Sequence, residues 1–492
     1  MARSVKTNYL YNLLYQITAI LLPLITMPYV SRVLSPQGVG TNSLTNANTQ
    51  YFMLLGTLGI TMYATKKIAT VRENKRKLRQ TFWEIFSIQF IGCMISYVIF
   101  VLVLGLNSSL GMYYMLQGFF ILSSAIDISW YFVGIEDFKN ASIRSFFVKV
   151  TSVILIFIFV KDSNDLWKYI LINSLTMFVG QFVMWFYVDK SNFSFKSLEK
   201  LKLKKHMLPV LVLFIPQVAS QIYTVLDKTM LGIYSPTVDV GYYDQSQKIV
   251  RILLTIITSL GMVMMPRIAS LTSKNQHDLV KDTLKKSFTV ISFLAVPIAF
   301  GIMSVSDRFI PLFFGYEYIS VIPLLKISSV LIIIIGLGNV FGTQYMIAVG
   351  KNKEYTISVC VGAVVNFILN LILIPKYSAL GAVIATVSAE LSIALIQLWC
   401  SREILDFSWI KETYKYWVSG IIMLLVVRLL DIGTHRNVLI LIRQIAGGMT
   451  VYFVMLLILR DKMLKNAFQT VKNRLKKDDL SEKEGKKTEK HI

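Results

Sequence analysis

The chain has 492 residues, of which 54% are hydrophobic and only 16% are charged, with a formal net charge of +23 and a mean hydropathy of +0.58. Soluble globular proteins carry roughly a quarter charged residues, so this composition excludes that class. The net charge would fit a nucleic-acid-binding protein, but the basic residues lie in short loops between long apolar blocks. The sequence therefore predicts an all-α membrane protein that crosses the bilayer many times.

The apolar blocks predict about 14 transmembrane helices, since roughly 20 apolar residues cross a bilayer core. The first block is too long for a signal peptide and contains Pro23 and Pro28, so it is interpreted as the first helix. One block is long enough that a break is expected near Gly336-Leu337-Gly338. The predicted spans are 8–31, 41–65, 82–106, 112–134, 145–160, 166–188, 207–231, 241–265, 288–306, 319–349, 355–375, 380–400, 416–431 and 438–459.

The basic residues predict the orientation, because cytoplasmic loops are enriched in Lys and Arg. Most of the 51 Lys and Arg residues fall on one side of these spans, the side that holds both termini, and we expect that side to be cytoplasmic. We therefore expect the bacterial cytoplasmic membrane, with both termini inside. The opposite face holds Arg32, Lys161, Lys168, Arg308, Lys376, Arg436 and Arg443.

The chain repeats itself at an offset of about 200 residues. Ser35-Pro36 followed by Val39-Gly40 has a counterpart in Ser235-Pro236 followed by Val240-Gly241. Two parallel six-helix lobes plus two C-terminal helices follow from this repeat, and paired lobes are typical of transporters. The predicted parts are an N-terminal lobe (1–190), a basic cytoplasmic linker (191–206), a C-terminal lobe (207–402), two extra helices (403–460) and a basic cytoplasmic tail (461–492).

Several further groups of residues resemble one known family over most of the chain up to about residue 460. They are Pro28-Tyr29-Val30-Ser31-Arg32-Val33-Leu34 with Gly38-Val39-Gly40, Trp130 with Gly134-Ile135-Glu136, Asp227-Lys228-Thr229-Met230-Leu231-Gly232, Val240-Gly241-Tyr242-Tyr243, Asn366 and Asn370 with Ile374-Pro375, and Gly381-Ala382 with Ala385-Thr386. The sequence resembles the polysaccharide-transport branch of the multidrug/oligosaccharidyl-lipid/polysaccharide exporter superfamily, in particular the repeat-unit flippases of O-antigen and capsule assembly.

The resemblance implies a substrate and a mechanism. Such proteins move undecaprenyl-diphosphate-linked oligosaccharides from the inner to the outer leaflet by alternating access. We therefore expect this lipid-linked sugar and the membrane lipids as partners, and a polysaccharide polymerase with its assembly machinery as further partners. We expect no nucleic acid, metal or cofactor, although transport could be coupled to a proton or sodium gradient or to the membrane potential.

Ionisable residues within the spans are the first candidates for a site, because they usually face a wet cavity or a partner. Lys248 and Arg251 are three residues apart and hence on one helical face. With Lys228 and Arg32 they could bind a diphosphate, since Arg grips phosphate oxygens through two parallel hydrogen bonds. The alternatives are a salt bridge to Asp227 or Asp244, or, for Lys248 and Arg251, snorkelling to the interface; for Arg32 the alternative is an interface anchor.

Other polar residues are candidates for sugar contact or for coupling. Asn8, Asn12 and Gln16 form a polar stripe that suits sugar hydroxyls, or hydrogen bonds between helices. Asp127, Asp227 and Glu390 are candidates for ion coupling or for ion pairing within the bilayer. Cys93, Cys360 and Cys400 are interpreted as packing residues.

Three classes of function remain to be compared. A membrane glycosyltransferase or polymerase would need large external loops that bind substrate, and the predicted external loops are short. Because the loops are short, the chain is not expected to be an enzyme. It also lacks a Walker motif, so it is not expected to hydrolyse ATP. A lipid II flippase or a multidrug exporter of the same superfamily is the alternative within transport.

Overall fold

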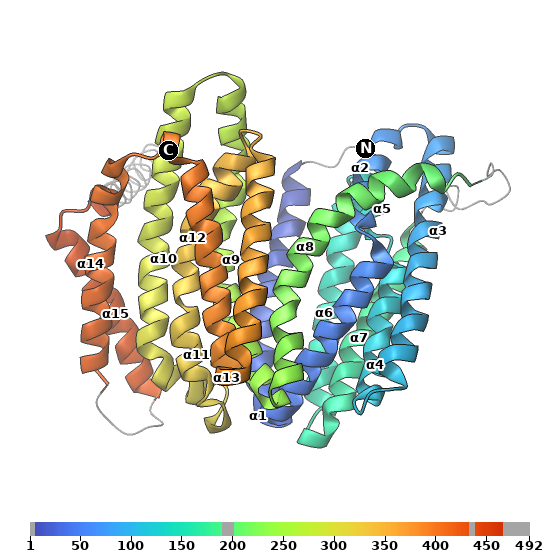
Figure 1. Cartoon of the computed structure of the whole chain (residues 1–492), viewed down its shortest axis with the longest axis horizontal. Helices are drawn as coiled ribbons and strands as arrows, with labels where there is room; N and C mark the ends of the chain where they lie inside the picture. Colours follow the sequence, from blue (N-terminus) through green and yellow to red (C-terminus); the bar gives the residue numbers. More distant parts are fainter. Residues whose placement is uncertain (1–4, 189–200, 432–437, 466–492) are drawn as a thin grey trace, which may run out of the picture. The chain divides into compact units, whose positions relative to one another are not determined.

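The computed structural model describes residues 5–188, 201–431 and 438–465, and their secondary structure is helical, without a strand (Figure 1). Within these ranges the side chains of 5–20, 138–141, 212–213, 215–220, 222–224, 262 and 407 are not described. The predicted all-α fold is confirmed.

The helices follow one another with short connections. Those of the first half are α1 (Val5–Thr57), α2 (Ile60–Val71), α3 (Lys75–Phe100), a π-helix η1 (Val101–Gly105), α4 (Gly111–Ala125), α5 (Ser129–Gly134), α6 (Phe138–Phe159), η2 (Ser163–Asp165), α7 (Leu166–Met184) and η3 (Trp185–Tyr187). Those of the second half are α8 (Lys204–Tyr234), α9 (Thr237–Ser273), α10 (His277–Phe313), η6 (Tyr316–Tyr318), α11 (Val321–Ser328), α12 (Val330–Asn339), a π-helix η7 (Val340–Ile347), α13 (Asn352–Cys400), η8 (Arg402–Ile404), α14 (Phe407–Leu429) and α15 (Val438–Ile458).

Each predicted membrane span falls on one or more of these helices. Nine segments of the described chain are long and apolar enough to cross a membrane. One of the nine, Asn352–Cys400, contains both predicted spans 355–375 and 380–400. The predicted spans outside the nine segments lie on α1, on α1 and α2 together (41–65), on α8 and on α14. Near Gly336-Leu337-Gly338, where a break was expected, the chain stays helical: the α-helix α12 passes at Asn339 into the π-helix η7.

Two of the long helices are pairs of spans joined at a sharp kink. The backbone at Ser35 in α1 has φ 58° and ψ 169°, and at Ser378 in α13 it has φ 47° and ψ −128°. A positive φ is costly for a residue other than glycine and breaks the helix direction. Pro36 follows the first kink directly, where its fixed φ suits the first turn of a new helix. The equivalent Ser235-Pro236 pair separates α8 from α9.

The chain divides into two compact units, each described here by itself. Unit 1 comprises Met1–Ile252, Ile310–Leu324 and Lys353–Ile393. Unit 2 comprises Leu253–Phe309, Leu325–Asn352 and Ala394–Ile492. The linear division into a lobe, linker, second lobe, two extra helices and tail stays a prediction. Most of the predicted linker (191–200) and of the predicted tail (466–492) lies outside the described residues.

The two copies of the sequence repeat contact each other inside unit 1. A Cβ atom on Gly40 would lie 1.8 Å from the carbonyl oxygen of Thr237, and one on Gly241 would lie 2.5 Å from that of Pro36. Only glycine permits so close an approach of two backbones. The Gln37 amide also donates a hydrogen bond of 2.6 Å to the Thr237 hydroxyl. The repeated Val-Gly pairs therefore serve to pack the beginning of one helix against the beginning of the other.

An aromatic core closes the end of unit 1 that α2, α3 and α5 share. Phe82, Trp83, Trp130 and Tyr131 are buried there, with ring centroids 5.3–5.4 Å from that of Phe82. Such contacts between rings contribute about 0.5–1.5 kcal/mol per pair beyond burial. This packing fixes the end of α2 and the beginning of α3, which together carry the basic residues of 66–79.

In unit 2, α14 packs against α15, and ion pairs join segments that are distant in sequence. Arg308 lies 2.5 Å from Asp431, and Lys351 lies 2.5 Å from Glu403. The Tyr345 hydroxyl donates to the same Glu403 carboxylate at 2.8 Å. The hydrogen bonds from Lys351 and Tyr345 lower the pKa of Glu403, which lies outside the predicted spans.

Candidate functional site: a buried charge cluster in unit 1

Two lysines share one carboxylate where the end of α8 meets the beginning of α9 in unit 1. The Asp244 carboxylate on α9 accepts from Lys228 of α8 at 2.5 Å and from Lys248 of α9 at 2.6 Å. The Asp244 side chain is 4% exposed, whereas that of Lys248 is 39% exposed. We name Lys228, Asp244 and Lys248 the lysine–aspartate cluster. The cluster carries two cations for one anion, so it has a net positive charge inside the apolar part of the chain.

The helical repeat of α9 builds this cluster. Asp244, Lys248 and Arg251 are spaced four and three residues apart, which places them along one face of the helix. Lys228 comes from α8, seven residues before the Ser235-Pro236 break that turns the chain back into α9. Arg251 is exposed and adds a third cation to the same helical face. The structure thus brings Lys228 and Lys248 to one carboxylate, and Arg251 lies on the same face of α9.

Asp227 lies in a different environment from its neighbour Lys228, because consecutive residues on a helix point about 100° apart. It is 3% exposed. Its carboxylate accepts hydrogen bonds from the Tyr243 hydroxyl, from Thr386 Oγ1 at 2.8 Å and from Asn370 Nδ2 at 2.6 Å. All three donors are neutral groups. Asn370 also donates to Asn366 at 3.0 Å, and we name these five residues the Asp227 network.

The remaining charged candidates are more dispersed. Arg32 is exposed on α1 and donates to the carbonyl oxygen of Leu312. Asp127 lies between α4 and α5, and its carboxylate accepts the backbone N–H of Ser129 at 2.8 Å, which is a turn geometry. Glu390 is half-buried on α13. None of these three residues is part of the cluster or of the Asp227 network.

The predicted sugar-binding stripe lies on α1, but the side chains of Asn8, Asn12 and Gln16 are outside the described residues. A second polar stripe on the same helix had not been predicted to form a site. Between residues 41 and 50, all but Leu44 and Ala47 are polar. Asn48 donates to Tyr114 at 2.7 Å and accepts from Thr229 at 2.8 Å, only one residue from Lys228. The density of amides and hydroxyls in an otherwise apolar block was the available signal.

Asp227 had been named as a candidate for coupling or ion pairing, but Asp244 and the residues around Asp227 were missed as site groups. The sequence analysis named Asp244 only as a partner for a salt bridge, and Asn366, Asn370 and Thr386 only as part of a resemblance. The structure brings these residues from α9 and α13 to the same part of unit 1 as α8. A cationic cluster beside neutral amides and hydroxyls can bind an anionic group together with a hydroxyl-rich one.

Comparisons with known proteins identify the family. Residues 5–272 match the family described as "Polysaccharide biosynthesis protein", which is more than half of the chain. The chain belongs to this family. The chain is also 23% identical to the "Putative O-antigen transporter" of Escherichia coli over 401 residues, which cover 80% of this chain and 96% of that one. It is 26% identical to the "Probable low-salt glycan biosynthesis flippase Agl15" of Haloferax volcanii, covering 52% and 55% of the two chains.

Solved structures identify the fold of the chain. It is similar to the lipid II flippase MurJ in an inward closed conformation, with a TM-score of 0.73, 20% identity and coverage of 92% of this chain and 100% of that one. An inward-facing multidrug resistance MATE family transporter of the MOP superfamily gives a TM-score of 0.60 at 11% identity, over 78% of this chain and 94% of the other. The predicted exporter fold is confirmed. The relatives carry the names of transporters and flippases, in agreement with the prediction of a transporter.

Proposed function

We propose that the protein is a flippase that moves undecaprenyl-diphosphate-linked oligosaccharide repeat units from the inner to the outer leaflet. The product would supply the assembly of a capsule, an exopolysaccharide or an O-antigen. The observation that carries this proposal is the net positive lysine–aspartate cluster, whose carboxylate is buried between apolar helices of a family member while Lys248 stays accessible. A charge in that position is costly unless it has a function or a partner, and a diphosphate is such a partner.

The proposed location is the bacterial cytoplasmic membrane, with both termini in the cytoplasm. The distribution of basic residues supports this orientation: the loop 66–79 and the terminal segment from Arg460 onward are both rich in Lys and Arg. Under this orientation the basic ends of α2, α3 and α8 lie at the inner leaflet, where the substrate is made.

In the proposed mechanism the protein opens in turn to the two sides of the membrane. Lys228, Lys248, Arg251 and Arg32 bind the diphosphate through charge-assisted hydrogen bonds, which are about twice as strong as neutral ones. The amides of Asn8, Asn12 and Gln16 contact sugar hydroxyls. Release to the outer leaflet is assisted by an inside-negative potential, which acts on the anion.

A buried carboxylate is the proposed coupling group. Asp227 has oxygen-bearing side chains around it, those of Tyr243, Asn366, Asn370 and Thr386. Protonation of Asp227, or sodium bound there, would neutralise its charge and shift the equilibrium between conformations. Asp127 and Glu390 are the alternative coupling groups. The proposed protein partners are a polysaccharide polymerase and its assembly machinery.

The experiment uses proteoliposomes that contain the purified full chain and a fluorescent undecaprenyl-diphosphate oligosaccharide. The fraction of label that an external reagent can reach is followed with time, with and without a proton or sodium gradient. Transfer that requires the protein and exceeds transfer of lipid II supports the proposed substrate. Preferred transfer of lipid II, or export of a cationic dye with no glycan transfer, would overturn it.

A further inference from the structure

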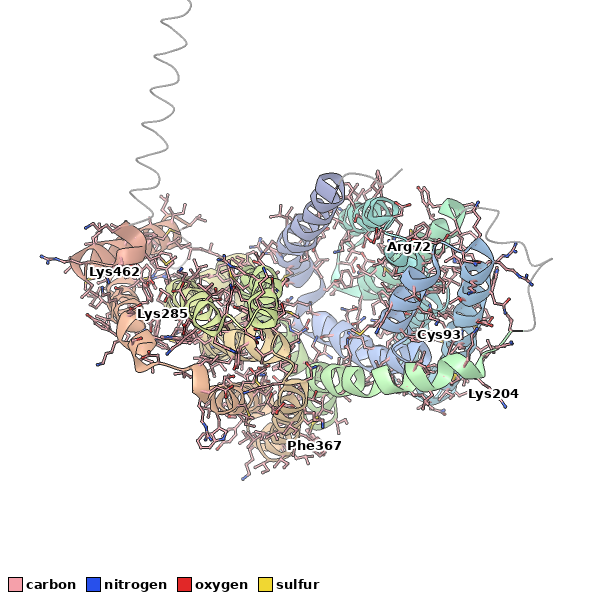
Figure 2. All side chains as sticks on the ribbon, turned by 90° about the horizontal axis from the view of Figure 1, so that it is seen from above. Arg72, Cys93, Lys204, Lys285, Phe367 and Lys462 are labelled. Carbon is pink, nitrogen blue, oxygen red and sulfur yellow. The ribbon has the colours of Figure 1, made fainter. Side chains whose placement is uncertain are left out.

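A second site with a strong positive charge lies away from the lysine–aspartate cluster, where α2 ends and where α3 and α8 begin. Figure 1 shows these three helix ends at the same end of unit 1, and Figure 2 looks onto that end, with Arg72 and Lys204 labelled. A cavity of about 1210 Å³ opens there. We name it the basic cavity. Six cationic side chains line it: Lys66, Lys67, Arg76, Lys77, Lys202 and Lys205.

A buried carboxylate forms the fixed floor of the basic cavity. The Glu84 side chain is fully buried and lies 2.5 Å from the Lys205 ammonium and 2.9 Å from the His206 imidazole. It also accepts from Gln80 at 2.8 Å and from the backbone N–H of Lys202 at 3.0 Å. These contacts tie the beginning of α8 to α3. The cavity wall is therefore held in place by interactions that a ligand does not have to supply.

His206 completes this floor as a neutral side chain. Its Nδ1 lies 2.6 Å from the Tyr63 hydroxyl, and its Nε2 faces Glu84. A neutral ring that accepts from Tyr63 and donates to Glu84 satisfies both contacts. Burial lowers the pKa of His206, and the hydrogen bond to Glu84 opposes this shift. The floor thus adds no further cation, and the one lining carboxylate is already fully occupied.

The charge balance of the basic cavity favours an anionic ligand. Its lining contains six cations and one carboxylate. Within the described part of the chain, Lys66, Lys67 and Lys77 have no ion pair. Arg72, the neighbouring cation, lies 2.6 Å from Glu136 instead. Like charges held within a Debye length of ~8 Å repel one another, and a bound polyanion relieves that repulsion.

The rim of the basic cavity indicates that the anion is attached to a lipid. Leu208, which also lines the cavity, is 72% exposed, and Pro209 beside it is exposed too. Both residues lie where α8 begins its predicted span, at the level of a membrane surface. A free nucleotide or inorganic phosphate would gain nothing from this apolar rim, whereas an acyl or prenyl chain would cover it.

We propose that the basic cavity binds the phosphate or diphosphate headgroup of a lipid at the membrane surface. Two sources have this chemistry: a polyprenyl diphosphate, which is the reactive end of the proposed substrate, and an anionic phospholipid. The site is distinct from Lys228, Lys248 and Arg251, so a lipid could be held here without being transported. Binding is therefore measurable whether or not the proposed flippase function is correct.

The test is direct binding to the purified full chain in detergent micelles. Undecaprenyl diphosphate and phosphatidylglycerol are the two lipid probes, and inorganic pyrophosphate is the soluble one. The triple variant Lys66→Gln, Lys67→Gln, Lys77→Gln removes three cations that have no ion pair among the described residues. The matched control, Lys274→Gln, Lys353→Gln, Lys462→Gln, removes equal charge at exposed positions away from the cavity.

We expect the triple variant to bind undecaprenyl diphosphate at least tenfold more weakly than the wild type, while the control stays within twofold. Affinity should fall as salt is raised. A parallel loss for phosphatidylglycerol at similar affinity assigns the site to bulk lipid, and a loss confined to undecaprenyl diphosphate assigns it to the substrate. Equal binding by wild type and triple variant, for both lipids, would overturn the proposal. The Lys66→Arg, Lys67→Arg, Lys77→Arg variant should retain binding, which separates charge from misfolding.

Discussion

Replacing Asp244 by Asn tests whether the carboxylate between the two lysines stabilises unit 1. The substitution keeps the shape of the side chain but leaves the ammonium groups of Lys228 and Lys248 without their shared counter-charge. Removing one partner of a buried ion pair costs about 3–5 kcal/mol. Water screens Lys248, which is 39% exposed, so the expected loss is near the lower end, about 3 kcal/mol.

Thermal unfolding in detergent, followed by tryptophan fluorescence, and unfolding by titration with SDS measure this loss. The control is Asp307→Asn, which breaks the pair with Lys326 at 2.7 Å. Asp307 is 49% exposed, so about 0–1 kcal/mol should be lost there. The double variant Asp244→Asn, Lys228→Gln should regain part of the stability, since one unpaired cation is removed. If Asp244→Asn costs no more than Asp307→Asn, the shared-carboxylate argument is wrong.

Three further predictions concern other contacts. Gly40→Ala should destabilise the protein by about 2–3 kcal/mol in the same unfolding assay, because the new Cβ would overlap a backbone oxygen. Gly38→Ala is the control: its Cβ would meet only a side-chain atom at 3.2 Å, so stability should change by less than about 1 kcal/mol. Glu403→Gln should cost less than about 1 kcal/mol at neutral pH, since the pair with Lys351 is exposed. Because the pKa of Glu403 is lowered in the folded state, its contribution is present above an unfolded pKa of about 4.3, and the difference in Tm should vanish on acidification below that value. The pKa of His206 is lowered too, so protonation favours the unfolded chain. The Tm of the wild type should therefore fall as pH drops below about 6.5, and more steeply than that of His206→Gln. Equal slopes of Tm against pH for the two proteins would contradict the assignment of His206 as neutral.

The helices could be predicted from the sequence because a bilayer imposes long apolar blocks. Their joints could be predicted only in part. Ser35-Pro36 indicated the end of a helix, and the structure places a kink at Ser35, although the helix resumes at once. Ser378 carries the second kink, in the gap between the predicted spans 355–375 and 380–400 and three residues after Pro375, but no proline follows it to mark the exact residue. The π-helix at Val340–Ile347 was signalled only by the glycines that precede it.

The charged residues of the candidate site could be predicted from the sequence, but their contact partners could not. Lys228 and Lys248 could be singled out because ionisable residues in spans are rare. Their partner could not be chosen, because Asp227 and Asp244 are both near in sequence and only the packing of α8 against α9 decides between them. Two of the three side chains that donate to Asp227, those of Asn370 and Thr386, come from residues more than 100 positions away, on α13. Contacts of that kind depend on tertiary packing, which periodicity does not report.

The central claim is that the cationic face of α9 handles the diphosphate of a lipid-linked oligosaccharide. The measurement that tests it most directly is the initial rate of glycolipid translocation in proteoliposomes that contain the Lys248→Ala, Arg251→Ala variant. Lys274→Ala, Lys353→Ala serves as the charge-matched control, with equal protein incorporation verified for both. Each hydrogen bond to a charged group contributes about 1.5–3 kcal/mol, so we predict at least a tenfold lower rate for the first variant and an unchanged rate for the control. Wild-type rates for Lys248→Ala, Arg251→Ala would contradict the account.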